Sequence, residues 1–339
     1  MPAGGEVRSS LESRPCGLCG SRFKRPFAVK FDLPVVACRW CGFVYAEPRL
    51  PEAELLKRYS PEYFRDEYLP IFRADRTGFD PDLVIGHYEP YLNMAARGFI
   101  PGGRLLDVGC GAGFFLKAAE RQGWEVEGIE ISSAAAEYAR TVLGLRVRLA
   151  RLEEAAFPDS AFDVVTLLDT LEHLGDPLRT LSEVRRVLKP GGRIILNTPD
   201  IESASRRELG EDWAVLSPAE HLSYFSARTL RRMLARAGFW KPFVRNLLRF
   251  NPDYTHAPSA PRREKWARRL EDPKSDAPTK LDDAWIRFET LQPRALRRHE
   301  NLEGFEDEAL ERMAGAELTL IRRRHLLQRL QRPDLPNLV

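Results

Sequence analysis

A glycine-rich stretch constrains the fold of this chain more than any other part of its sequence. Residues 105–115 read LLDVGCGAGFF, a pattern typical of a buried parallel strand, a tight turn and the first turn of a helix. Gly109, Gly111 and Gly113 remove side chains where the backbone turns sharply and a ligand comes close. The free N–H groups at the helix start then face that ligand. The stretch therefore predicts an α/β domain with a ligand at this turn.

Three residues near the turn narrow the choice of ligand. Phe114 stands where the dinucleotide fingerprint has its third glycine, which argues against a nicotinamide dinucleotide. Asp107, two positions before the first glycine, suits a cationic amino-acid group better than a pyrophosphate. Glu130 closes the strand-like run 126–130, where a carboxylate commonly binds ribose hydroxyls. These residues favour a ligand with both a ribose and an amino-acid end.

Strand and helix patterns alternate from residue 103 onward, which predicts a parallel sheet covered by helices on both faces. The expected strands are 104–108, 126–129, 147–149, 163–168, 193–197 and one near 243–250, and the expected helices are 114–122, 133–143, 178–188 and 227–237. The alternating run 316–321 predicts a last strand.

Six further motifs follow the glycine stretch in order. They read FDVV at 162–165, LEHL at 171–174, VLKPGG at 187–192, IILNTP at 194–199, HLSYFS at 221–226 and AGF at 237–239. As a set they resemble the class I S-adenosylmethionine-dependent methyltransferases over residues 86–250. The resemblance implies a Rossmann-like doubly wound sheet of seven strands, the last one antiparallel, with strands six and seven forming a hairpin at the sheet edge.

The resemblance also implies which residues contact the cofactor. The contacts to the methionine end and the ribose fall on Asp107, Gly109, Gly111, Gly113 and Glu130. Leu168 and Asp169, after the fourth strand, are expected beside the cofactor. Arg151 departs from the family pattern, because related sequences often have an acidic residue there that contacts the adenine amino group. The backbone of Leu152, or the side chain of Glu153, is expected to replace that contact.

Four of the five cysteines form two Cys-x-x-Cys-Gly knuckles, at Cys16, Cys19, Cys38 and Cys41. Each knuckle lets two thiolates chelate one ion, and two knuckles complete the tetrahedral four-thiolate site of structural zinc. The spacing predicts a zinc ribbon at 14–47, too small to fold without its metal. The alternatives are four buried free cysteines or a redox pair, although the strand–helix context of a redox pair is missing. Cys110 is expected to be a small buried filler.

The remaining segments complete the predicted organisation of the 339 residues. We expect a flexible tail at 1–13, a helical linker or lid at 48–100, the methyltransferase core at 101–254, a charged insertion at 255–313 that is helical around 281–291 and 306–314, the last strand at 314–323 and a basic tail at 324–339. An aromatic cluster at 59–72 either roofs a substrate pocket or packs the ribbon onto the main domain. Because no apolar run is long enough for a signal or a membrane span, a cytoplasmic protein is expected.

Catalytic residues are harder to read from the sequence, because methyl transfer from a sulfonium mainly requires positioning and the exclusion of water. A proton acceptor is needed only when the acceptor is a hydroxyl or an acidic carbon. His173, after the fourth strand, and His221 with Tyr224, in HLSYFS, are the candidates. Structural roles, in helix entry or loop packing, are the alternative for both histidines.

Three functions follow from these observations. The first is a methyltransferase that acts on a hydroxyl or carbon of a small molecule, such as a sugar or a secondary-metabolite intermediate. The second is an RNA methyltransferase that reads RNA with the ribbon. A net charge of +3 argues against this nucleic-acid partner, as does the absence of an Asn-Pro-Pro-aromatic turn at 168–171 and of any cysteine after Cys110. The third is a non-catalytic scaffold.

Overall fold

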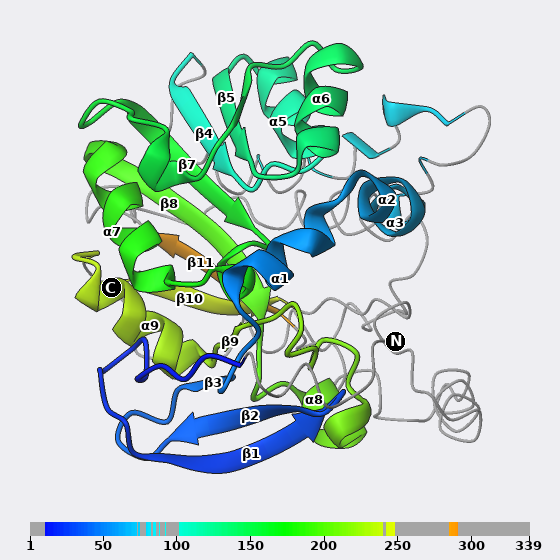
Figure 1. The fold of residues 1–339 in the computed structure, drawn as a ribbon. Coiled ribbons are helices and arrows are strands. Elements are labelled where there is room, and N and C mark those ends of the chain that lie inside the picture. The colour runs from blue at the N-terminus through cyan, green and yellow to red at the C-terminus, as the bar shows by residue number, and fades with distance from the viewer. Residues whose placement is uncertain are drawn as a thin grey trace, which may run out of the picture.

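Seven strands form the central sheet, in the order β10-β11-β8-β7-β4-β5-β6 (Figure 1). The computed structural model describes residues 11–72, 102–239, 242–247 and 285–290, together with 74, 79–82, 84, 85, 88 and 92. The parallel strands are β4 (Arg104–Val108), β5 (Glu125–Glu130), β6 (Val147–Leu149), β7 (Phe162–Leu168) and β8 (Leu188–Pro199). The chain leaves β4 toward β5 and leaves β7 toward β8. The carboxyl ends of β4 and β7 therefore mark the switch point at which ligands bind in such sheets.

Helices cover both faces of this sheet, which confirms the predicted doubly wound architecture. They are α5 (Phe114–Arg121), α6 (Ser133–Thr141), α7 (Pro177–Val187) and α9 (Ala227–Arg236). Leu106 and Val165 pack in one core with residues of α7 and α9. Their neighbours Leu105 and Val164 pack in a second core with residues of α5 and α6. This alternation follows from the period of two along each strand.

The loop after β7, and the longer segment between β8 and α9, both end at helices with capped starts. Asp176 accepts a hydrogen bond from Arg179 N at 3.0 Å, and Pro177 occupies the first turn of α7. Ser226 and Thr229 form a reciprocal capping box at the start of α9. Such caps satisfy N–H groups that the helix itself leaves free. They fix where each of the two histidine-bearing loops ends.

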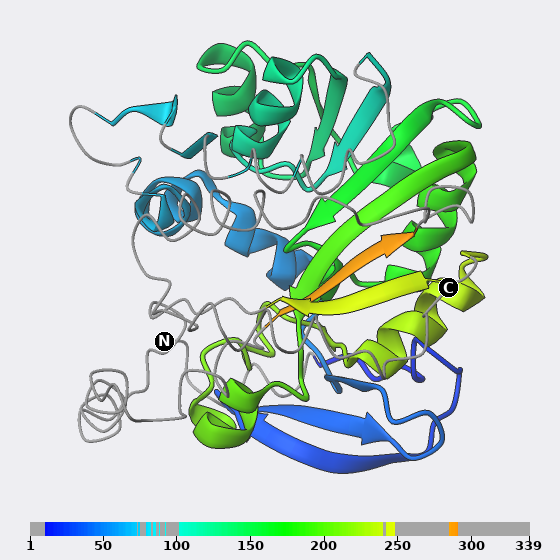
Figure 2. The same ribbon diagram turned by 180° about the vertical axis from the view of Figure 1, so that it is seen from behind.

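A second, four-stranded sheet lies below the first in Figure 1. It contains β1 (Lys24–Lys30), β2 (Leu33–Cys38), β3 (Val44–Ala46) and β9 (Ser223–Tyr224), all antiparallel. The first three strands belong to the predicted ribbon, whereas β9 comes from the second half of the chain. The short helix α8 (Ala204–Leu209) lies beside β1 and β2 in both views (Figures 1 and 2).

A run of short helical turns joins the two sheets: α1 (Glu52–Leu56), η2 (Lys57–Tyr59), α2 (Pro61–Tyr63), the π-helical turn η3 (Phe64–Tyr68) and α3 (Leu69–Ile71). Its aromatic side chains pack on α5 and α6. The Phe64 ring lies 5.8 Å from Tyr138, and the Phe72 ring lies 5.3 Å from Phe114. Phe64 and Phe72 of the aromatic cluster therefore pack against the helices that follow β4 and β5.

Two of the predicted boundaries need correction. The strand that pairs antiparallel with both β8 and β10 (Pro242–Leu247) is β11, at Trp285–Thr290, and β10 is the edge strand. A helix around 281–291 is therefore wrong, because the sheet edge offers pairing partners to a segment rich in Trp, Ile, Phe and Thr. The predicted tail at 1–13 also extends too far, since Glu12 forms a backbone bridge with Arg49. The range 314–339 lies outside the described residues.

Candidate active site

Two left-handed glycines of the loop after β4 lie against side chains of other elements. Gly109 and Gly111 have φ angles of +75° and +54°. A Cβ on Gly109 would lie 2.7 Å from Thr170 Oγ1, and a Cβ on Gly111 would overlap the Tyr68 hydroxyl. Tyr68 Oη also accepts a hydrogen bond from Ala112 N at 3.2 Å. Both the backbone conformation and the packing therefore require glycine at these positions.

Three backbone N–H groups hold the carboxylate of Glu130. Gly111 N donates to Oε2 at 2.8 Å, while Ile131 N and Ser132 N donate to Oε1 at 2.7 and 2.8 Å. Burial nevertheless raises the pKa of Glu130. Because an ionised carboxylate has about four lone-pair positions, Glu130 retains the capacity to accept bonds from ligand hydroxyls.

Asp107 is a second buried carboxyl group on the same side of the sheet. Its side chain is 2% exposed and accepts a hydrogen bond from Thr166 Oγ1 at 2.6 Å. Burial raises the pKa of Asp107 to about 7, and the nearby charge of Glu130 adds to this effect, against the opposing bond from Thr166. A cationic group beside Asp107 would favour its ionised form.

The end of β7 meets the glycine loop. Thr170 Oγ1 lies 2.9 Å from Leu168 O and 3.2 Å from Val108 O. Asp169 has a left-handed φ of +51°, and its N–H donates to Asn197 Oδ1 at 3.0 Å. The amide of Asn197 donates back to the Asp169 carboxylate. Leu168 and Asp169 therefore lie at the switch point between β4 and β7, where the sequence places them.

The loop after β6 shows how the Arg151 position differs from the family pattern. Arg151 forms an ion pair with Glu52 of α1. Glu153 accepts a hydrogen bond from Thr180 Oγ1 at 2.5 Å, so its carboxylate already has a partner in α7. Leu152, which begins the turn η4 (Leu152–Glu154), has a buried side chain. A contact of the Leu152 backbone with adenine stays a prediction.

His173 and His221 form a pair, although 48 positions separate them in the sequence. Their rings lie 4.6 Å apart at an angle of 74°. His173 Nδ1 lies 3.1 Å from Glu220 O, and His221 Nδ1 lies 2.7 Å from Val215 O. Because a carbonyl oxygen only accepts, both Nδ1 atoms carry the proton, and both Nε2 atoms keep a lone pair. Tyr224, on β9, is buried with its ring 6.4 Å from His221.

Burial keeps this pair uncharged. It lowers the pKa of His221 to about 4, and it lowers the pKa of His173 well below the ordinary value, with the neighbouring His221 adding to the effect. Both rings are therefore neutral near pH 7.

Glu172, which the sequence reasoning did not single out, completes a cluster with the two histidines. A Glu172 carboxyl oxygen and one nitrogen of each ring lie within 4.8 Å of one another. Glu172 Oε2 accepts a bond from Thr198 Oγ1 at 2.9 Å, whereas Oε1 is buried with no hydrogen-bond partner among the described residues. Burial, with the charge of Asp169, raises the pKa of Glu172 to about 8. A buried polar atom without a partner is costly, and a bound ligand or water can supply that partner.

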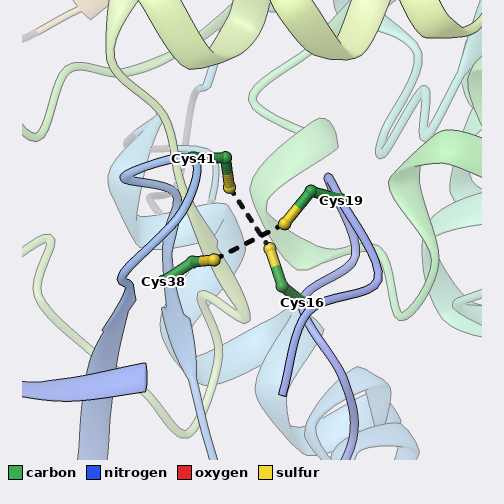
Figure 3. A group of neighbouring side chains, drawn as sticks. All are labelled: Cys16, Cys19, Cys38 and Cys41. Carbon is green, nitrogen blue, oxygen red and sulfur yellow. Dashed lines mark hydrogen bonds between the residues drawn. The ribbon is translucent and has the colours of Figure 1, made fainter. Parts of the chain in front are cut away.

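The four ribbon cysteines converge on one point (Figure 3). The Sγ atoms of Cys16 and Cys41, and those of Cys19 and Cys38, are 3.5 Å apart, and all four lie within 4.8 Å of one another. A tetrahedral zinc with Zn–S bonds of about 2.3 Å needs S–S separations of about 3.8 Å. The thiols are free, with no disulfide among them. This donor set fits a zinc ion.

Comparison with known proteins identifies the domain that contains most of the central sheet. A family model described as a methyltransferase domain matches residues 85–240. The chain carries a class I, S-adenosylmethionine-dependent methyltransferase domain. A second model, for the N-terminal domain of actin-binding protein F, matches residues 285–339, of which the structure describes only 285–290.

The methyltransferase domain is similar to curated relatives over part of their length. A ubiquinone biosynthesis O-methyltransferase of Alkalilimnicola ehrlichii is 42% identical over 107 residues, which are 30% of this chain and 43% of the relative. One from Idiomarina loihiensis is 29% identical over 51% of this chain and 79% of the relative. Several matches thus span less than half of the relative's length. A solved structure of an S-adenosylmethionine-dependent methyltransferase from Archaeoglobus fulgidus aligns at 19% identity and a TM-score of 0.48, covering 66% of this chain and 98% of the other.

Two contacts to the methyltransferase domain come from residues before it, which sequence reasoning missed. Tyr68 reaches the glycine loop, and Arg58 pairs with Glu220 at 2.7 Å, beside the histidines. The only sequence signal was the density of aromatic residues at 59–72. No helix among the described residues is long and apolar enough to cross a membrane.

Proposed function

We propose that this chain transfers the methyl group of S-adenosylmethionine to a hydroxyl group of a small molecule. The observation that carries the proposal is that two buried carboxyl groups, Asp107 and Glu130, and a neutral histidine pair lie at adjoining strand ends. The first pair suits the cofactor and the second suits a hydroxyl acceptor. The O-methyltransferase names of the relatives support oxygen as the methylated atom.

The cofactor side is formed by the glycine loop and the two carboxyl groups. When bound, S-adenosylmethionine supplies a methyl group on a positively charged sulfur, from which it leaves readily. Asp107 fits the ammonium of the methionine end, because a cation would offset the burial that raises the pKa of Asp107. Glu130, preorganised by three N–H donors, fits the ribose hydroxyls.

The acceptor side is formed by the histidine pair and Glu172. The Nε2 atom of His221 or His173 takes the proton of the acceptor hydroxyl, while the Nδ1–H bonds to backbone carbonyls hold each ring in one orientation. A pKa of about 8 keeps Glu172 largely protonated near pH 7. Its Oε1 then binds a second polar group of the acceptor, so we infer an acceptor with two neighbouring polar groups. A sugar or a hydroxylated secondary metabolite meets this requirement.

We also propose that Cys16, Cys19, Cys38 and Cys41 hold a structural zinc ion. Four thiolates close the coordination shell and leave no position for substrate, as in structural sites. Gly20 and Gly42, with φ of +75° and +77°, close the two knuckles.

Formation of S-adenosylhomocysteine tests the methyltransferase proposal. The purified chain is incubated with methyl-labelled S-adenosylmethionine and, separately, with a catechol, a sugar nucleotide and a structured RNA. We expect labelled product with a small hydroxylated acceptor, no product with Asp107→Ala, and a rate reduced about 100-fold or more with His221→Asn. Product with RNA alone would favour the RNA alternative. Failure of the folded chain to bind S-adenosylhomocysteine would favour the scaffold.

A further inference from the structure

Strand β9, which contains Ser223 and Tyr224 of the HLSYFS motif, pairs with a strand of the ribbon. In the four-stranded sheet β9 is an edge strand, and its ladder partner is β3. Tyr224 pairs with Val44, Ser223 pairs with Tyr45, and Ala46 N donates to Leu222 O at 3.1 Å. The ribbon strands and β9 lie together below the central sheet in both views (Figures 1 and 2). The segment from His221 to Tyr224 thus takes its register from the N-terminal ribbon.

The two faces of β3 both pack against elements that flank the histidines. On one face Val44 and Tyr224 share a buried cluster with Trp213, which lies in the loop before His221. On the other face Phe43, which immediately precedes β3, places its ring 5.2 Å from Phe225. Leu222 N also donates to Glu172 O at 2.8 Å. Through these contacts, the ribbon supports the segments that carry His221 and Glu172.

The cysteine knuckles set the direction of β3. Cys38 N donates to Phe43 O at 2.8 Å, and Gly42 N donates to Cys38 O at 3.0 Å, so the second knuckle and the start of β3 form one turn. Arg232 of α9 donates to Cys41 O at 3.3 Å. Because a ribbon of this size has little core of its own, its order depends on the metal.

The cofactor side is anchored independently of the ribbon. The hydrogen bonds of Asp107 and Glu130 run to Thr166 and to backbone N–H groups of residues 111, 131 and 132, all inside the methyltransferase domain. The hydrogen bonds that hold these two carboxyl groups therefore do not involve ribbon residues.

We propose that the metal-held ribbon is a positioning element of the acceptor site, which fixes β9 and thereby His221 and Tyr224 without contributing to cofactor binding. The proposal rests on the proposed function, because it takes the histidine cluster as the acceptor side. In this proposal the four thiolates do not contact the acceptor, but they determine where His221 and Tyr224 lie.

The test compares zinc-loaded and chelator-treated full-length chain. The ring signals of His173 and His221 are followed by NMR, with assignments from His173→Asn and His221→Asn, and S-adenosylhomocysteine affinity is measured by calorimetry. We expect metal removal to shift both ring signals and re-added zinc to restore them, while the Kd of S-adenosylhomocysteine changes by less than about twofold. In turnover, the acceptor KM and kcat change and the KM for S-adenosylmethionine does not. Trp40→Ala, in the same knuckle but 74% exposed, is the matched control and should change nothing.

A second variant decides the matter if chelation unfolds the whole chain. Phe43→Leu keeps all four cysteines and removes the ring contact with Phe225. Shifted His221 signals with unchanged S-adenosylhomocysteine affinity support the proposal. Histidine signals that do not move, in Phe43→Leu or in folded metal-free chain, overturn it. Zinc-loaded wild type that fails to bind S-adenosylhomocysteine instead contradicts the proposed function, so the two failures are distinguishable.

Discussion

We predict that Asp107 makes cofactor binding depend on pH in a range where few carboxyl groups titrate. With a pKa of about 7 in the free protein, the ionised fraction is about 0.9 at pH 8, about 0.5 at pH 7 and about 0.1 at pH 6. Because the ammonium of S-adenosylhomocysteine requires the ionised form, the apparent Kd equals the intrinsic Kd divided by this fraction. The affinity for S-adenosylhomocysteine therefore falls as the pH falls, by about tenfold from pH 8 to pH 6.

Calorimetric titration with S-adenosylhomocysteine at pH 6, 7 and 8 measures this dependence. Titrations at pH 7 in buffers of different ionisation enthalpy should also report the release of about half a proton per ligand bound. Asp107→Asn is the matched control, since its Oδ1 still accepts the bond from Thr166. It should bind about 10- to 100-fold more weakly, with no change between pH 6 and pH 8. An equal pH dependence in wild type and variant would refute the assignment of the titration to Asp107.

Three other predictions concern the loop, the histidines and the metal. Gly111→Ala should lower the free energy of unfolding by more than Gly144→Ala, because both positions have positive φ but only Gly111 has a side chain, Tyr68, packed against it. The backbone strain alone costs about 1 kcal/mol at either position. Equal losses of unfolding free energy in chemical denaturation would contradict the role of this packing. At saturating S-adenosylmethionine, where the bound cofactor keeps Asp107 ionised, kcat should stay flat from pH 7 down to about pH 5, because burial lowers the pKa of His221 to about 4. A fall in kcat centred near pH 6.5 would instead mean that an ordinary histidine is used. The purified chain should contain about one zinc per molecule by mass spectrometry, and Cys16→Ser should lower both this content and the melting temperature, with Cys110→Ser as the control.

Much of the fold could be read from the sequence, because its signals are local. The alternation of strand and helix patterns located β4 to β8 and the helices between them, since each strand must be apolar on both faces when helices cover both. The edge of the sheet was harder. Trp285–Thr290 is a short run that contains Arg287 and Glu289, and β11 pairs with β8 across more than 80 residues of intervening sequence. A short run cannot be assigned to helix or strand from its sequence alone, and the strand that pairs with it decides the assignment.

In the candidate site, too, some residues could be predicted from the sequence and others only from the structure. Asp107 near the end of β4 and the glycines Gly109 and Gly111 of the following loop are neighbours in the sequence, and the structure places Glu130 within hydrogen-bond distance of that loop. His173 and His221 were each recognisable from sequence as candidates, but nothing in their spacing predicted a ring separation of 4.6 Å. Glu172 drew no attention, because only burial makes its carboxyl group unusual.

The sequence by itself determined the glycine turn and the cysteine knuckles. In both, a few neighbouring residues fix the backbone conformation and the spacing of the chemical groups. Only the tertiary structure decided that Tyr68 fills the space above Gly111, that the two histidines meet, and that β9 joins the ribbon. These contacts join segments far apart in the chain, and their formation depends on how whole elements pack and not on the residues beside them.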